Sequence, residues 1–137
     1  MEYEITLRLL IATSVGAFIG IERQWNHCIA GLRTNILVAV GACLFVLIGS
    51  FTSIDHTSTL IASQIVSGIG FLGAGVIMRD GFTIHGLDTA ATIWCSAAVG
   101  TLAGAGYLTV SIIGTIFILM VNGLLRPLAK YFPRKGS

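Results

Sequence analysis

Long apolar stretches alternate with short polar ones along this chain. Three of them cover about residues 5–21, 34–50 and 60–78, and a fourth, 89–125, has no charged residue over 37 positions. One helix over the fourth stretch would be about 55 Å long, whereas the hydrocarbon core of a bilayer is about 30 Å thick. It must therefore break, and Gly104-Ala105-Gly106 is the natural place. The pattern predicts five helices, over about 5–21, 34–50, 60–78, 89–104 and 107–125, with a re-entrant segment as the alternative for the short fourth helix.

The composition indicates an all-α integral membrane protein. The chain has 137 residues, is 55% hydrophobic, and has a mean hydropathy of +0.90. Only 10% of its residues are charged, against about 25% in a typical soluble domain. Five crossings would use nearly the whole chain, so we expect a single transmembrane domain over residues 1–137. The first ten residues, MEYEITLRLL, carry two acids where a secretory signal has basic residues, so the first helix is expected to remain.

The distribution of Lys and Arg predicts the orientation. Five crossings place Arg8 on one side of the membrane and the other seven basic residues on the opposite side: Arg23, Arg33, Arg79, Arg126, Lys130, Arg134 and Lys135. The N-terminus is then outside and the C-terminus cytoplasmic, and the outside loop 51–59 contains no Lys or Arg. A re-entrant fourth segment would move the basic tail to the wrong side. The basic residues form no stripe, so nucleic acid is not an expected partner. Membrane lipids are expected partners, because the basic C-terminal tail would lie at the membrane surface.

Small residues at three- or four-residue spacing lie on one helix face and predict close helix packing, because they allow two backbones to approach each other in the membrane. Such faces occur in the first, third and fourth helices: Ala12, Gly16 and Gly20; Ser63, Ser67, Gly70 and Ala74; Thr92, Ser96, Gly100 and Gly104. The same faces would serve a homo-oligomer equally well, and a flexible, gated third helix is a further alternative.

Two charges oppose the dipoles of the helices on which they lie. Glu22 comes at the C-terminal end of the first helix and Arg33 at the N-terminal end of the second, although helix dipoles favour cations at C-termini and anions at N-termini. Both ends face the same membrane surface across a short connection. We therefore expect a Glu22–Arg33 ion pair that closes this hairpin.

Further charged residues lie on the same predicted cytoplasmic edge. Arg79 is expected to close the third helix, and Asp88 to be the N-cap of the fourth. Together with Asp80, the carboxylates of Glu22 and Asp88 are candidates for a Mg²⁺ site. The alternative is that they serve as caps, salt bridges and lipid contacts. No recognised metal motif is present, so no cofactor is expected.

Four segments resemble, in order and spacing, the transmembrane domain of the MgtC/SapB family of bacterial membrane proteins. They are GIERQ, AGLRTNILVAVGA, QIVSGIGFLGAGVI and GLDTAATIWCSAAVG, and the resemblance covers about residues 5–125. It implies an inner-membrane protein with about five spans, linked to growth under Mg²⁺ limitation, acid tolerance and survival inside macrophages. It also marks these positions: Glu22, Arg23, Arg33, Thr34, Asn35, Gly68, Gly70, Gly73, Gly75, Thr89, Ala90, Ala91, Thr92 and Trp94.

The resemblance implies a function through partner proteins, since the best-known member is thought to act on other membrane proteins rather than to carry Mg²⁺. Two departures are visible. Many members continue into a soluble cytoplasmic domain, whereas this sequence stops at Ser137, and the family usually has Thr where Asp88 stands.

The first hypothesis is therefore a modulator of a partner membrane protein during adaptation to low Mg²⁺, acid or host stress. The alternative is a Mg²⁺ or other ion transporter, a channel or its accessory subunit, with the hydroxyls of the fourth helix as polar lining. An enzyme is not expected, because the sequence has no Ser-x-x-Lys or HExxH motif.

Overall fold

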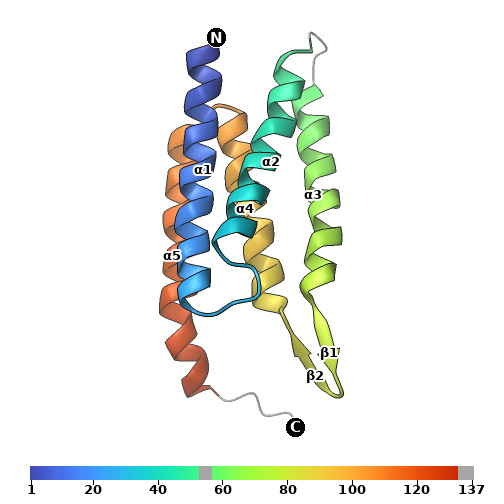
Figure 1. Ribbon diagram of the computed structural model, residues 1–137, viewed down its shortest axis with the longest axis vertical. Coiled ribbons are helices and arrows are strands. Elements are labelled where there is room, and N and C mark those ends of the chain that lie inside the picture. Colours follow the sequence, from blue (N-terminus) through green and yellow to red (C-terminus); the bar gives the residue numbers. More distant parts are fainter. Residues whose placement is uncertain (53–56, 133–137) are drawn as a thin grey trace.

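The computed structural model describes residues 1–52 and 57–132 and consists of five helices and one short β-hairpin (Figure 1). The elements are α1 (Glu2–Trp25), α2 (Leu32–Ser50), α3 (Thr57–Val76), β1 (Met78–Asp80), β2 (Thr83–His85), α4 (Leu87–Gly104) and α5 (Leu108–Tyr131). Four helices, α1, α2, α3 from Thr59 onward, and α5, are long and apolar enough to cross a membrane. Five helices are thus confirmed at the predicted places, although α1 and α5 extend several residues further than expected.

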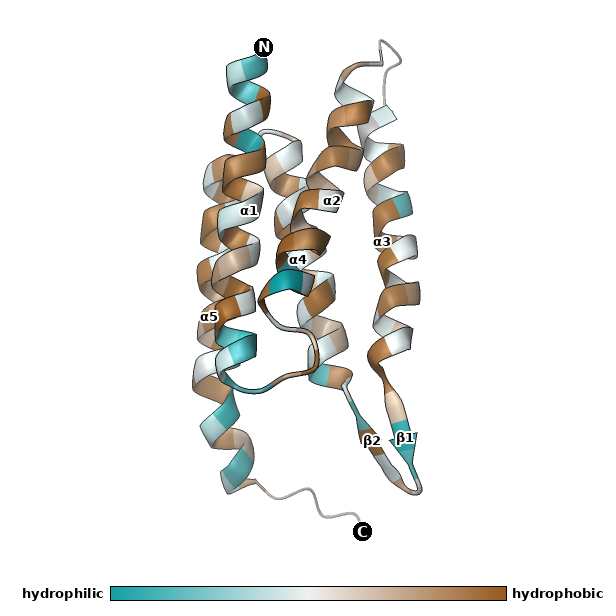
Figure 2. Ribbon diagram, viewed as in Figure 1, coloured by the Kyte–Doolittle hydropathy of each residue, from teal (hydrophilic) through white to brown (hydrophobic). Residues whose placement is uncertain are grey.

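The shorter helix α4 passes through the whole bundle beside α1 and antiparallel to it. At its beginning, Thr89 accepts a hydrogen bond from Arg23, near the end of α1. At its end, the carbonyl oxygen of Gly104 accepts one of 2.8 Å from Arg8, near the start of α1. Because its two ends meet opposite ends of α1, α4 does not turn back as a re-entrant segment would. It packs against α1, α2, α3 and α5, and it carries several weakly polar or small residues along its length (Figure 2).

The small residues of α1 and α4 bring three backbones into contact, as predicted. A Cβ atom at Gly16 would lie 2.8 Å from Ile36 Cα, and one at Gly20 would lie 2.6 Å from Leu32 Cα. On α4, a Cβ atom at Gly100 would lie 2.7 Å from the Cα of Ala39 on α2. Real Cβ atoms do not approach so closely, so these glycines fix the α1–α2 and α2–α4 distances.

The predicted small-residue face of α3 behaves differently: Ser63, Ser67, Gly70 and Ala74 are all exposed, so the expectation of close packing is wrong for this face within the chain. A Cβ atom at Gly68, Gly70 or Gly75 would have no neighbour within 4 Å, and one at Gly73 would lie 3.7 Å from Ala90 Cβ. Helix α3 stands at the side of the bundle (Figure 1) and contacts α2 and α4. Between α2 and α3 lies an apolar groove of about 740 Å³, whose lining includes Leu37, Gly41, Phe45, Gly68 and Leu72.

The connection between α3 and α4 is a β-hairpin, which the hydrophobic pattern did not predict. Met78 pairs with His85 and Asp80 with Thr83 in antiparallel register. Gly81 begins the two-residue turn at a φ of +60°, the positive value that primed hairpin turns require. Arg79 therefore lies in β1 rather than at the end of α3, and its Nε donates to the Gly81 carbonyl at 2.9 Å.

We call the end of the bundle that carries this hairpin the hairpin end. Five of the six basic residues that the structure describes lie here, namely Arg23, Arg33, Arg79, Arg126 and Lys130, and Arg8 lies at the opposite end. The sidedness is therefore as expected, while which end is cytoplasmic stays a prediction. Arg134, Lys135 and the middle of the 51–59 loop lie outside the described residues.

Candidate functional site

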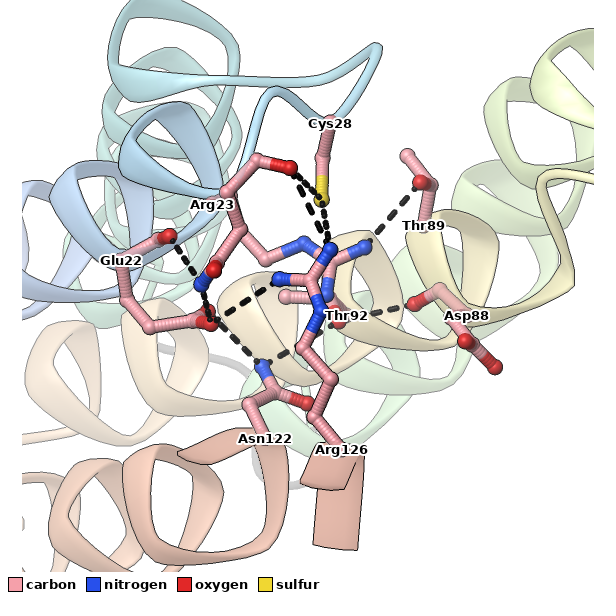
Figure 3. A network of polar contacts seen from close by, with 9 residues as sticks. Glu22, Arg23, Cys28, Asp88, Thr89, Thr92, Asn122 and Arg126 are labelled. Carbon is pink, nitrogen blue, oxygen red and sulfur yellow. Dashed lines mark hydrogen bonds and ion pairs between the residues drawn. The ribbon is translucent and has the colours of Figure 1, made fainter. Parts of the chain in front are cut away.

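Glu22 is the centre of a polar network that joins α1 to α5 at the hairpin end (Figure 3). Its Oε1 accepts a 2.6 Å hydrogen bond from Asn26 Nδ2 and lies 3.9 Å from Arg126 Nη1. Its Oε2 accepts a 3.4 Å bond from Asn122 Nδ2. Arg126 Nη2 also donates to the Asn26 carbonyl at 3.2 Å. The carboxylate is thus held by two amides and one guanidinium, and it ties the end of α5 to the α1–α2 connection.

The expected Glu22–Arg33 pair is wrong. Arg33 is the second residue of α2, is exposed, and makes no ion pair with a described residue. The partner of Glu22 is instead Arg126, which lies on α5 beyond the predicted end of the fifth helix at about residue 125. Sequence reasoning had assigned Arg126 to topology alone and had missed Asn26 and Asn122. The available signal was Asn122, an amide near the end of an otherwise apolar span.

Arg23 lies beside this network and is buried, with 6% of its surface exposed. Its Nη2 donates to Thr89 Oγ1 at 3.2 Å, and its Nε has no hydrogen-bond partner among the described residues. The neighbouring Thr92 hydroxyl donates to the Asp88 carbonyl at 2.8 Å and accepts from Asn122 at 3.4 Å. Arg23, which sequence reasoning explained by topology, is therefore packed between α1 and α4.

The two remaining acidic candidates do not converge on Glu22. Asp88 is the second residue of α4 and not its N-cap, which is Gly86 in the left-handed conformation. The cap shifts because the chain leaves β2 in a tight turn, in which a Cβ atom at Gly86 would lie 3.0 Å from the Val76 carbonyl carbon. Asp80 is exposed on the hairpin. Across residues 1–52 and 57–132, no three His, Cys, Asp or Glu side chains gather as a metal-binding group.

Asn35 forms a second polar link in the interior of the bundle. It is fully buried, and its Nδ2 donates to the carbonyls of Ala30 at 3.1 Å and Gly31 at 2.8 Å. Its Oδ1 accepts a 2.7 Å bond from Ser96 on α4. Its neighbour Thr34 points to the α2–α3 groove instead, and Trp94 is exposed on the outer surface of α4.

An open cavity of about 1160 Å³ lies next to the Glu22 network, between the first half of α4 and the last half of α5. Its polar lining residues are Arg23, His85, Asp88, Thr89, Thr92, Asn122 and Arg126, and its apolar ones include Phe117, Val121, Leu125 and Phe132. We call it the α4–α5 cavity. It combines the polar edge of the bundle with an apolar wall on α5, a helix apolar enough to cross a membrane.

Exchanging the charges of Glu22 and Arg126 tests the ion pair. We expect Glu22→Arg and Arg126→Glu each to lower thermal stability in detergent, by about 0.2–1 kcal/mol for the pair itself. The reversed double variant should recover part of that loss. Arg33→Glu is the matched control and should melt like the unchanged chain. If Arg33→Glu, rather than Arg126→Glu, recovered the stability lost in Glu22→Arg, then Arg33 and not Arg126 would be the partner of Glu22.

The chain is similar to curated proteins over most of its length. The MgtC family profile matches residues 9–131. Protein MgtC of Brucella abortus strain 2308 is 59% identical over 85% of this chain and 49% of its own length. Protein MgtC of Salmonella typhimurium strain 14028s is 56% identical over 90% of the chain and 53% of its own. An uncharacterised Synechocystis protein is 53% identical over 93% and 55%, respectively.

No solved structure matches this chain. It spans about half the length of the curated relatives above. The match nevertheless covers nearly all of α1 through α5, including both polar links and the α4–α5 cavity. The resemblance seen in the four sequence segments is thereby confirmed, and the chain belongs to the MgtC family.

Proposed function

We propose that this chain is a membrane-embedded modulator, which binds another protein in the bacterial inner membrane during adaptation to low Mg²⁺. Membership of the MgtC family supports the setting. We extend the proposal to adaptation to acid and to host stress, because the family that the sequence resembles is linked to both.

The observation that carries the modulator role is the α2–α3 groove. It lies between two apolar helices, and its lining is almost entirely apolar, with Thr34 and Gln64 as its polar residues. Gly41 and Gly68 face it with no neighbour within 4 Å of a Cβ position, so a helix backbone fits against both. Apolar helices associate in a bilayer through such close backbone approach. A transmembrane helix of a partner protein therefore suits this groove.

The ion-transport alternative receives less support. Three hydroxyls of α4 that a polar pathway would need are engaged inside the protein: Ser96 donates to Asn35, Thr92 to the Asp88 carbonyl and Thr101 to the Ala97 carbonyl. Gly100 and Gly104 also bring the α2 and α4 backbones together. A hydrated path between these helices would have to break that contact.

Filling the groove tests the modulator. The chain carrying Gly68→Leu is expected to lose complementation of growth at low Mg²⁺, in a bacterium lacking its own homologue, because leucine would occupy the groove. Gly75→Leu is the matched control on the same helix, since Gly75 also has open space around it but does not line the groove. Equal growth with both variants would remove the groove from the function.

Two further measurements separate the modulator from a transporter. A photo-crosslinking residue in place of Leu37, in the groove, should capture a membrane protein in cells, and one in place of Val110, which does not line it, should not. The purified chain in liposomes with a Mg²⁺-sensitive dye is expected to give no specific flux. Flux that Asp88→Ala abolishes would replace the modulator by the transporter.

A further inference from the structure

Arg23 is a buried cation with no acidic partner in the described part of the chain. It is 6% exposed, its one side-chain hydrogen bond goes to the neutral hydroxyl of Thr89, and its Nε is unpaired. Arginine stays protonated in proteins, and an uncompensated buried charge is strongly unfavourable. Glu22, the residue before Arg23, is already bound by Asn26, Asn122 and Arg126 (Figure 3). The position of Arg23 therefore calls for a negative charge from outside the chain.

The N-terminus of α4 adds positive potential at the same place. This helix has 18 residues, its N-cap is Gly86, and no side chain caps it. The first N–H groups of a helix have no intrahelical acceptor, and the macrodipole makes this end attractive to anions. Thr89, which accepts from Arg23, is the third residue of the helix. The guanidinium thus lies against the positive end of α4, where a cation alone is unfavourable.

Both groups line the open α4–α5 cavity, whose volume is about 1160 Å³. Arg126 lies at its rim, with 41% of its side chain exposed. The opposite wall is apolar, formed by Phe117, Val121 and Leu125 of α5 together with Phe132. A ligand that fits has an anionic head between the arginines and α4, and an apolar part along α5.

An aspartate and a histidine also line the cavity. The negative charge of Asp88 would repel an anionic ligand, but Figure 3 shows its carboxylate pointing away from the two guanidinium groups. His85 is exposed at the end of β2. Glu22 neutralises part of Arg126, so Arg23 is the principal cation for a ligand.

We propose that the α4–α5 cavity binds a phosphate group through Arg23, Arg126 and the N-terminus of α4. Arginine and helix N-termini together are the groups that bind phosphate oxygens with charge-assisted hydrogen bonds. The apolar wall along α5 assigns the phosphate to an anionic phospholipid, whose acyl chains lie against α5 in the leaflet at the hairpin end. A free phosphate ion has no apolar part that could contact this wall.

Native mass spectrometry of the full chain in detergent, titrated with dioleoyl phosphatidylglycerol or dioleoyl phosphatidylcholine, tests this site. We expect one phosphatidylglycerol to bind in preference to phosphatidylcholine. Arg23→Gln should weaken that binding by about tenfold or more, because charge-assisted bonds are lost. Arg126→Gln should weaken it less. Lys130→Gln is the matched control, since it removes one charge from the same helix outside the cavity, and should change the affinity by less than about twofold.

Asp88→Asn gives an independent test of sign. It removes a negative charge from the cavity, so we expect phosphatidylglycerol to bind more tightly, whereas a cation site would be weakened by the same change. If circular dichroism shows that Arg23→Gln does not fold, Asp88→Asn still distinguishes an anion site from a cation site.

The source of the phosphate is tested by thermal unfolding in sodium phosphate and in sodium chloride of equal ionic strength. We expect no difference between the two salts. Protection by inorganic phosphate, abolished in Arg126→Gln and without lipid selectivity, would overturn the lipid assignment. Equal losses with Arg23→Gln, Arg126→Gln and Lys130→Gln, together with no gain from Asp88→Asn, would overturn the site as a whole.

Discussion

Replacing Gly100 by valine is expected to prevent the bundle from assembling. A Cβ atom at this position would overlap the Ala39 carbonyl oxygen and lie 2.7 Å from Ala39 Cα. Both are backbone atoms, so no side-chain rotation relieves the clash and α2 must move away from α4. Overpacking of a closely packed core costs about 1–3 kcal/mol and sometimes more, and here it also separates the Ser96–Asn35 hydrogen bond. We expect little folded protein in size-exclusion chromatography of detergent extracts.

The same replacement at Gly70 is the control. Gly70 lies within α3 with no atom within 4 Å of a Cβ position, so Gly70→Val should give a normal elution profile and thermal transition. A normal profile for Gly100→Val as well would mean that α2 and α4 are not in backbone contact.

The buried Asn35–Ser96 bond supplies the second large effect. Asn35→Ala removes the acceptor of the Ser96 hydroxyl and the side-chain donor to the Ala30 carbonyl, both of which stay buried. A buried polar group left without its partner costs about 1–3 kcal/mol, so we expect a loss of about 2–6 kcal/mol for the two groups. The free energy of unfolding, from denaturant titration of the detergent-solubilised chain, measures this change.

Two comparisons isolate the bond from the loss of a side chain. Ser96→Ala alone is expected to destabilise by about 1–3 kcal/mol, because it leaves Asn35 Oδ1 unpaired. Ser14→Ala should have almost no effect, since Ser14 is exposed and bonds only to the Leu10 carbonyl of its own helix. If Asn35→Ala and Ser96→Ala were additive in the double variant, the two side chains would not be energetically coupled.

The helices and their contact faces could be predicted because they depend on local composition. An apolar stretch of bilayer length becomes a helix wherever it stands in the chain, and glycines at four-residue spacing lie on one face of it. Gly16, Gly20 and Gly100 therefore contact their neighbours as expected. The same rule failed for Gly70, on the small-residue face of α3, because such a face shows that close approach is permitted, and not which helix approaches.

The polar site could not be predicted to the same degree. Glu22 and Arg33 are close in sequence and have opposite charges, and this suggested a local pair. The observed partner, Arg126, is about a hundred residues away and lies just beyond the predicted end of the fifth helix. An ion pair depends on where α5 ends in space, and hydropathy does not report that position. The β-hairpin was missed because its two strands have three residues each, too few to produce an alternating pattern.

The amino-acid sequence by itself determined a membrane-embedded helical chain of the MgtC family, with its basic residues gathered at one end. Only the tertiary structure decided which charges are paired, which glycines are in contact, and that Arg23 is buried against the start of α4. The physical reason is the distance along the chain over which each interaction acts. Helix formation and bilayer insertion depend on neighbouring residues, whereas the neutralisation of a buried charge depends on side chains that meet from α1, α4 and α5.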